Sequence, residues 1–189
     1  MTPILGIMAS QISGHLGPAP IPIVVVPNVY ESIATVTVGT ATGTVTFSSI
    51  PSTFKHLQLR ANFAMSTSDN FMGRFNGDTA TNYSTHYFYG SGTATGAYGA
   101  TNGGIMNWSY ADTANNRMVW IGDILDYTNA NKYKTVRRLN GYDANGSGFI
   151  FAGSDLWRST ATISTITMTT NGASNFTTGS KFAIYGIKS

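Results

Sequence analysis

Three histidines are the first candidates for acid–base chemistry, because an imidazole changes its charge between about pH 5 and 8. They are His15, His56 and His86. A serine hydrolase would also need a nucleophile on a strained turn and an acid that orients the base. No Gly-x-Ser-x-Gly motif lies near His56 or His86, and His15 lies in the N-terminal segment. The spacing favours surface or rim histidines, and we predict no catalytic residue.

Paired carboxylates, which could hydrolyse a glycosidic bond, are the second candidate chemistry. The chain has only eight acidic residues, which are Glu31, Asp69, Asp78, Asp112, Asp123, Asp126, Asp143 and Asp155. Asp123 and Asp126 lie three positions apart, so on a strand they would face opposite sides. Asp78 and Asp143 lie in turns rich in Gly and Asn, where aspartate caps the local backbone. We therefore predict that the protein is not an enzyme, and a small glycan-degrading enzyme remains the less favoured alternative.

Metal and cofactor sites have little support in the sequence. The segment DANGSG (143–148) has a faint likeness to a calcium-binding loop, but it lacks the later carboxylates and the closing glutamate. A hairpin turn is the favoured interpretation. The chain contains no cysteine, which excludes disulfides, thiolate catalysis and cysteine-based zinc sites. We predict no metal and no cofactor.

Aromatic side chains are the best candidates for recognition, because β-sandwich proteins often stack sugars on exposed rings; this is an analogy at the level of the fold. Tyr98 lies in a Gly-rich stretch that should be exposed. We select Tyr98, Trp108, Asp143 and Asn145 as possible glycan contacts. For each of Trp108, Trp120 and Trp157, the favoured alternative is a place in the core or in a subunit interface.

The low charge of the chain argues against two classes of partner. Charged residues make up 10% of the sequence, against a typical value of about 25%, and the net charge is +3. In KYKTVRR (132–138), we predict that Lys132, Lys134 and Arg138 share one strand face and that Arg137 faces the other way. A nucleic-acid groove has a heavier basic excess, so no nucleic acid is expected. The longest apolar run near the start, IPIVVVP, has seven residues against the ~20 needed to span a bilayer, so no membrane is expected.

The elements that would position these residues are strands. From residue 30 onward, runs of Val, Ile, Thr, Phe and Tyr alternate with turn residues. In the segment 52–65, Leu57, Leu59, Ala61 and Phe63 share one face and polar residues the other. The predicted strands are 30–38, 43–50, 52–65, 71–78, 83–90, 105–110, 117–127, 132–143, 149–157, 163–170 and 180–188. Residues 91–104 are predicted to form a long surface loop, and no helix is expected.

Many short strands without helices must close into a barrel or pair as two sheets. Strand lengths of six to ten residues, with both long and short connections, favour an all-β fold: a two-sheet β-sandwich of jelly-roll or Greek-key type. We assign residues 29–189 to this domain. The last strand, KFAIYGIK, is almost continuously apolar, so we expect it to be central or to meet a partner with its outer face.

Residues 1–28 are predicted to form an extended N-terminal docking arm. Pro18, Pro20, Pro22 and Pro27 enforce an extended course and prevent a helix. The apolar residues of such an arm need cover, which another chain could provide as a groove or a sheet edge. We select Pro3, Ile4, Leu5, Ile7, Met8, Ile21, Ile23, Val24, Val25 and Val26 as the docking residues. The alternative is that the arm packs on its own domain as an extra strand.

Several stretches together resemble a widespread family of small structural proteins of tailed bacteriophages, common in phages of aquatic bacteria and cyanobacteria. They are TPILGIMASQISG, YESIATVTVG, VTFSSIPSTFKHLQLR, FNGDTATNYSTHY, DILDYTNANKYKTVR, WRSTATISTITM and SKFAIYGIK. The resemblance covers nearly the whole chain in the same order, and segment 18–29 departs from it most. It implies a virion structural protein, of the kind described as tail-fibre or minor tail proteins. It does not specify the place in the virion.

From the residues and the resemblance together, we expect an external tail or baseplate appendage, fibre-like, that is attached by its arm and contacts host surface glycans. The expected partners are other virion proteins in the tail, baseplate or capsid. We also expect a homo-oligomer, with a trimer as the first choice, because phage surface appendages are commonly threefold. The alternative function is a capsid decoration or cement protein that stabilises the head.

Overall fold

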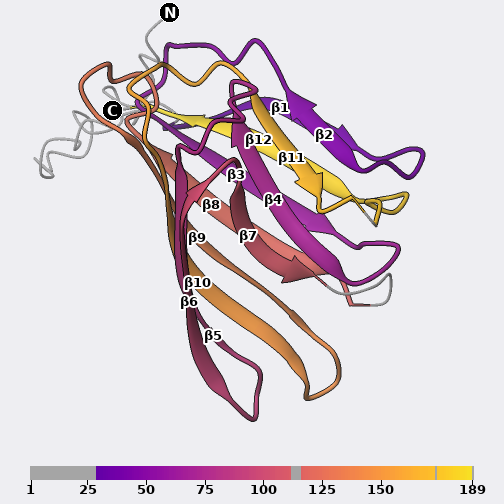
Figure 1. Ribbon diagram of the computed structural model, residues 1–189. Helices are drawn as coiled ribbons and strands as arrows, with labels where there is room; N and C mark the ends of the chain where they lie inside the picture. Colours follow the sequence, from indigo (N-terminus) through magenta and orange to yellow (C-terminus); the bar gives the residue numbers. More distant parts are fainter. Residues whose placement is uncertain (1–28, 112–115, 173, 189) are drawn as a thin grey trace, which may run out of the picture.

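The computed structural model describes residues 29–111, 116–172 and 174–188 (Figure 1). The predicted docking-arm residues at 1–28 lie outside these ranges. The strands of the described part are β1 (Tyr30–Thr37), β2 (Thr44–Phe47), β3 (His56–Phe63), β4 (Asp69–Phe75), β5 (Tyr83–Gly90), β6 (Thr95–Gly103), β7 (Met106–Ala111), β8 (Met118–Leu125), β9 (Lys134–Asp143), β10 (Gly148–Trp157), β11 (Ile166–Thr170) and β12 (Lys181–Ile187). The ranges described contain no helix that could cross a membrane.

The strands form two antiparallel sheets that pack face to face. The order is β1-β12-β3-β8-β9-β10-β5-β6 in the eight-stranded sheet and β2-β11-β4-β7 in the four-stranded sheet. Four antiparallel pairs, β1 with β12, β2 with β11, β3 with β8 and β4 with β7, alternate between the two sheets. This winding is that of a jelly roll. The predicted two-sheet β-sandwich of jelly-roll type is confirmed.

Two hairpins are inserted into this jelly roll. One, β5–β6, lies between β4 and β7 along the chain, and the other, β9–β10, lies between β8 and β11. Strand β10 pairs with β5, so the two hairpins form one ribbon that continues the large sheet beyond β8. We call these four strands the hairpin extension. In Figure 1 the distal ends of these strands extend below the rest of the domain, beyond the edge of the four-stranded sheet.

The prediction of a surface loop at residues 91–104 is wrong, because most of this segment forms strand β6. Its Gly- and Ala-rich sequence has no period-two pattern, but an edge strand needs only backbone hydrogen bonds to one neighbour, here β5. The turn is confined to the start of the segment, where Ser91 N–H donates to the Ala94 carbonyl at 2.9 Å. The other eleven strands lie where the alternating pattern predicted them, with shorter bounds at several ends.

Aromatic rings fill the core between the two sheets. Phe71 lies 4.5 Å from Phe63 and 5.3 Å from Trp108, measured between ring centroids, and Trp108 lies 4.9 Å from Trp120. Trp108, Trp120 and Trp157 are all buried, which confirms the core alternative for the three tryptophans. The prediction that Trp108 contacts a glycan is therefore wrong.

The place of Trp108 depends on a glycine in β4, the neighbouring strand of the same sheet. A Cβ at Gly73 would lie 2.0 Å from a carbon of the Trp108 ring, so only glycine allows the indole to lie flat on β4.

The last strand, β12, lies inside the large sheet, between β1 and β3, as expected from its apolar sequence. The described chain begins beside it: Lys188 N–H donates to the Val29 carbonyl at 2.9 Å. The register places this corner at the end of the sheet where β3 begins and β8 ends. The turns of the hairpin extension lie at the opposite end (Figure 1).

Candidate functional site

The hairpin extension carries a cluster of aromatic side chains on the face that it shares with the core. Cross-strand neighbours place them together: Tyr87 pairs with Tyr98, and Tyr89 pairs with Phe151. Phe149 pairs with Tyr142 on β9. We call the six residues the aromatic shelf; they are Tyr87, Tyr89, Tyr98, Tyr142, Phe149 and Phe151.

The rings of the aromatic shelf are in continuous contact. Tyr87 and Tyr98 are stacked with centroids 5.2 Å apart, and Phe149 and Phe151 are stacked at 5.5 Å. Tyr89 joins the two pairs, 6.4 Å from Tyr87 and 5.9 Å from Phe149. The four-stranded sheet ends at β7 and leaves the distal part of this face uncovered. Tyr98 is 44% exposed, the other tyrosines and Phe149 are half-buried, and Phe151 is buried.

A glycine on the edge strand holds one ring of the shelf flat. Gly96 pairs with Tyr89, and a Cβ at Gly96 would lie 2.6 Å from the Tyr89 ring. The ring therefore covers the backbone of β6, in the way that aromatic side chains compensate for a cross-strand glycine. The Gly-rich character of β6, which suggested a loop in the sequence, is what allows the aromatic ring to lie across the strand.

A buried ion pair supports the proximal end of the shelf. Arg138 Nε donates to Asp155 Oδ2 at 2.9 Å, and both side chains are fully buried. Thr85 Oγ1 donates to the other carboxylate oxygen. The Arg138 guanidinium also lies 5.1 Å from the centre of the Tyr87 ring. Burial raises the pKa of Asp155, and the neighbouring Arg138 opposes that rise.

The same cluster joins the extension to the smaller sheet. Arg138 Nη2 donates to the Asn107 carbonyl of β7 at 3.4 Å, and Thr85 Oγ1 lies 3.2 Å from the same oxygen. These contacts connect β5 and β9 to the edge of the four-stranded sheet. They hold the aromatic shelf in a constant position relative to the sandwich.

The two hairpin turns at the distal end lie side by side. A Cβ at Gly92 would be 3.4 Å from the Gly146 carbonyl oxygen, so the turns nearly touch. Between them is a hollow of about 210 Å³, lined by residues 90–92, 142–143 and 146–150. The structure thus brings together the stretches 91–104 and 143–148 in which we predicted glycan contacts.

The predicted glycan contacts lie in three different places. Tyr98 lies on the aromatic shelf, while Trp108 is in the core. Asp143 and Asn145 lie in the β9–β10 turn: Asp143 Oδ1 accepts from Asn145 N–H at 2.8 Å, and Asn145 has a left-handed φ of 60°. This geometry confirms the hairpin-turn interpretation of DANGSG.

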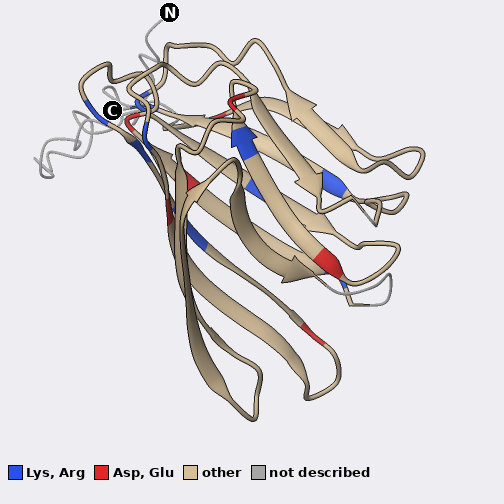
Figure 2. Cartoon of the chain, viewed as in Figure 1, with Lys and Arg blue, Asp and Glu red and all other residues tan. Residues whose placement is uncertain are grey.

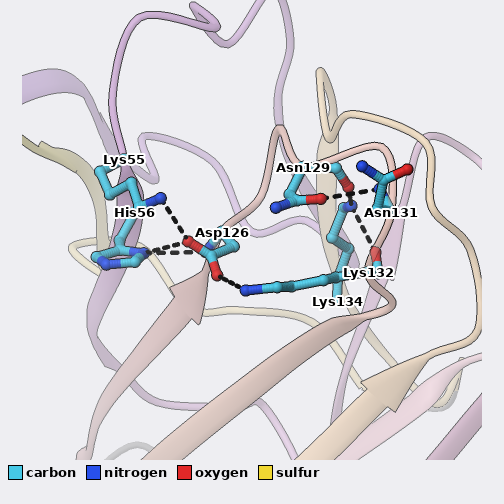
Figure 3. Close-up of polar contacts among 7 residues, drawn as sticks. All are labelled: Lys55, His56, Asp126, Asn129, Asn131, Lys132 and Lys134. Atoms are coloured by element: carbon cyan, nitrogen blue, oxygen red, sulfur yellow. Dashed lines mark hydrogen bonds and ion pairs between the residues drawn. The ribbon is translucent and has the colours of Figure 1, made fainter.

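Two basic side chains of KYKTVRR have structural roles inside the protein. Lys134 and Arg138 do share a strand face, but that face points into the protein. Lys134 Nζ donates to the carbonyl of Asn129 and, at 2.9 Å, to that of Lys132 (Figure 3). It also donates to the Thr160 carbonyl at 3.1 Å. Burial lowers the pKa of Lys134. Its ammonium group therefore links the loop that contains Asn129 and Lys132 to the loop that contains Thr160.

Asp126 forms the centre of a second charged cluster, at the end of the sheet where the described chain begins (Figure 3). Its carboxylate lies 3.1 Å from Lys55 Nζ and 2.9 Å from Lys132 Nζ. Hydrogen bonds from Lys132 and Lys55 lower the pKa of Asp126 to about 2. Its backbone N–H donates to His56 Nδ1 at 2.9 Å, so His56 is a rim histidine that accepts a turn hydrogen bond.

The other acid–base candidates are separated. His86 is exposed on the outer face of the large sheet. Asp123 accepts from Gln58 Nε2 at 2.7 Å and makes no pair with Asp126, which lies beyond the end of β8 in a turn. Within the described ranges, no group of three or more His, Asp and Glu residues could hold a metal ion.

Comparisons of this chain with protein-family models, curated proteins and solved structures find no match.

Proposed function

We propose that the protein is a structural protein of a bacteriophage virion: an external tail or baseplate appendage that is attached through residues 1–28 and contacts host surface glycans with its hairpin extension. The resemblance to small tailed-phage proteins supports the virion assignment. The jelly roll alone does not, because one fold serves many functions.

The observation that carries the proposal is that the start of the described chain and the hairpin turns lie at opposite ends of the domain. The described chain begins at Val29, at the corner formed with Lys188, and the hairpin turns lie at the opposite end of the large sheet. Strands of ten residues, such as β9 and β10, extend about 33 Å. An arm attached at one end would therefore present the aromatic shelf and the paired turns away from the particle.

The chemistry of the extension fits neutral sugars. No Lys, Arg, Asp or Glu occurs at residues 83–103, and Asp143 is the single one at residues 139–153. Figure 2 shows that the distal part of the extension is almost entirely tan, with one acidic position in red. Aromatic rings offer apolar faces to the C–H side of a sugar, and tyrosine hydroxyls add hydrogen bonds. Because Asp143 caps its own turn and Asp155 is buried in an ion pair, we propose binding without hydrolysis.

Binding to glycan can be tested by titrating the full chain with surface polysaccharide extracted from the host bacterium. Tyr98→Ala removes the exposed ring of the shelf and should weaken binding several-fold, since one aromatic contact is worth about 0.5–1.5 kcal/mol. Tyr110→Ala, at an exposed tyrosine of the four-stranded sheet, is the matched control and should bind as the wild type does. Equal binding by both variants, or release of reducing ends by the wild type, would contradict the proposal.

The place in the virion can be tested by labelling intact particles with gold-conjugated antibody against residues 29–189. Gold at the tail end is the expected result. The second candidate is a capsid decoration or cement protein. It is favoured by the exposed side chains of Phe88, Val119, Leu139 and Ile150 on the outer face of the large sheet, because exposed apolar groups suit contact with neighbouring subunits. Gold over the head would establish that alternative, and unlabelled particles would overturn both.

A further inference from the structure

The outer face of the eight-stranded sheet, which faces away from the four-stranded sheet, is apolar over β5, β8, β9 and β10, whereas Arg60, Asn62 and Lys181 are exposed on it over β3 and β12. Exposed fractions are 67% for Phe88, 60% for Ile150, 57% for Val119 and 51% for Leu139. Together with half-buried Ile121 and Ala152, we call these residues the apolar outer face. Side chains of this kind are normally covered, so their exposure indicates a surface that meets another chain segment.

The strand register shows that these residues are contiguous. Ile121 pairs with Leu139, Leu139 with Ala152, and Ala152 with Phe88, which forms one row across four strands. Val119 and Ile150 flank Gly141 in the neighbouring row. A shallow hollow of about 810 Å³ is lined by the first row together with the polar row beside it. On one side the face is bordered by a polar row, Asp123, Arg137, Ser154 and His86.

The same chain contains an apolar segment of matching character. Residues 21–26 read IPIVVV, and the first charged residue of the chain is Glu31. Pro22 and Pro27 have no N–H groups, which makes the segment a poor partner for a sheet edge. Such a segment is better suited to lie on a sheet face, held by its side chains.

The length of chain between residues 21–26 and Tyr30 limits which copy of the protein this segment can cover. The centre of the apolar outer face, between β9 and β10, is about 22 Å across the sheet from β1 and about 13 Å along it from Tyr30, or roughly 25 Å in a straight line. The midpoint of residues 21–26 is six to seven residues before Tyr30, which spans at most about 23 Å even when the chain is fully extended. The segment therefore cannot be centred on the face of its own domain.

We propose that residues 21–26 of one copy lie across the apolar outer face of a second copy, so that the protein assembles as a homo-oligomer through exchanged arms. Residues 3–8 lie further out along the arm and remain available for another virion protein. The inference does not depend on the proposed function, since it follows from the outer face, the apolar segment and the length of chain between them.

Cysteine cross-linking tests the proposal directly, because the full chain has no cysteine of its own. A chain with Val24→Cys and a differently tagged chain with Leu139→Cys are co-expressed and oxidised. The expected product is a disulfide-linked pair of about twice 20.1 kDa that carries both tags. Replacing Leu139→Cys by Tyr110→Cys, on the four-stranded sheet, should abolish the product.

The double variant Val24→Cys/Leu139→Cys distinguishes the two possible locations of the segment. Cross-links between chains support exchange, whereas a cross-link formed only within one chain would show that the arm covers its own domain and would overturn the proposal. Absence of any cross-link to Leu139→Cys, with the wild type oligomeric, would assign the face to another occupant and would also overturn it.

Light scattering of the full chain provides an independent measurement. Leu139→Lys/Ile150→Lys and Ile23→Ser/Val25→Ser should each reduce the mass to that of the monomer, 20.1 kDa, while circular dichroism stays that of the wild type. The control Tyr110→Lys should keep the oligomeric mass. A monomeric wild type would overturn the inference but would leave the gold-labelling test of the proposed function unaffected.

Discussion

Arg138 and Asp155 form an ion pair of 2.9 Å in which neither side chain is exposed, directly beneath the ring of Tyr87. The pair lies where the hairpin extension joins the sandwich, and it connects β9 and β10 to the Asn107 carbonyl of β7. Burying two charges is costly, so a pair of this kind is better understood as fixing one arrangement of strands than as a source of net stability. Here the arrangement is the position of the aromatic shelf.

Breaking this pair should be costly. Asp155→Asn and Arg138→Met each leave one buried charge without its partner, and each should lower the free energy of unfolding by about 3–5 kcal/mol. The double variant Arg138→Met/Asp155→Asn should lose less than the sum of the two single variants. Urea unfolding followed by near-ultraviolet circular dichroism measures all three. Additive losses would show that the two side chains contribute independently.

Lys134 should also contribute to stability, because its ammonium group donates to three backbone carbonyls. Lys134→Met keeps most of the side-chain volume but leaves buried acceptors unpaired, so we expect a loss of about 1–3 kcal/mol in unfolding free energy. Lys181→Met, at an exposed position of β12, is the matched control and should change stability by less than about 0.5 kcal/mol. Equal effects in a thermal melt would rule out this role of Lys134.

The close approach of Gly96 and Tyr89 predicts a local effect on the shelf. In Gly96→Ala the new Cβ would meet the Tyr89 ring at 2.6 Å and must displace it. We expect an altered near-ultraviolet tyrosine signal and several-fold weaker glycan binding, with the fold intact. Gly99→Ala is the control, because its Cβ would come no closer than 3.9 Å to any neighbour. If both variants behave as the wild type does, the shelf geometry does not depend on Gly96.

The cluster around Asp126 predicts a pH dependence of stability. The pKa of this carboxyl falls from 3.8 to about 2 on folding, so its contribution is present above about pH 4 and is lost as the pH falls towards 2. The difference in melting temperature between the wild type and Asp126→Asn should therefore shrink over that interval. Asparagine accepts the left-handed φ of 48° at this position, so the comparison reports the charge. A difference that is independent of pH would contradict the assignment.

Which residues share a strand face was determined by the sequence itself. The alternation in segment 52–65 predicted that Leu57, Leu59, Ala61 and Phe63 would lie together, and all four are buried. The turn at 143–148 was equally predictable, because Asp143 and Asn145 have local preferences for a turn that do not depend on distant parts of the chain. Local geometry and side-chain chemistry are sufficient for both predictions.

Strand β6 could not be predicted in this way. Its Gly and Ala residues show no alternation, and its strand conformation comes from hydrogen bonds to β5 and from the Tyr89 ring that covers Gly96. Nor could the sequence indicate that the hairpins β5–β6 and β9–β10 would pair, since β10 lies far from β5 along the chain.

Only the tertiary structure decided which faces are covered. Trp108 and Tyr98 are both aromatic residues on strands, yet Trp108 is fully buried and Tyr98 is 44% exposed. Lys134 and Arg138 gave a basic pattern in the sequence, and the fold buries both. A period of two determines which side chains point the same way. Whether they meet a second sheet depends on how far that sheet extends, and the four-stranded sheet ends at β7, before it reaches the aromatic shelf.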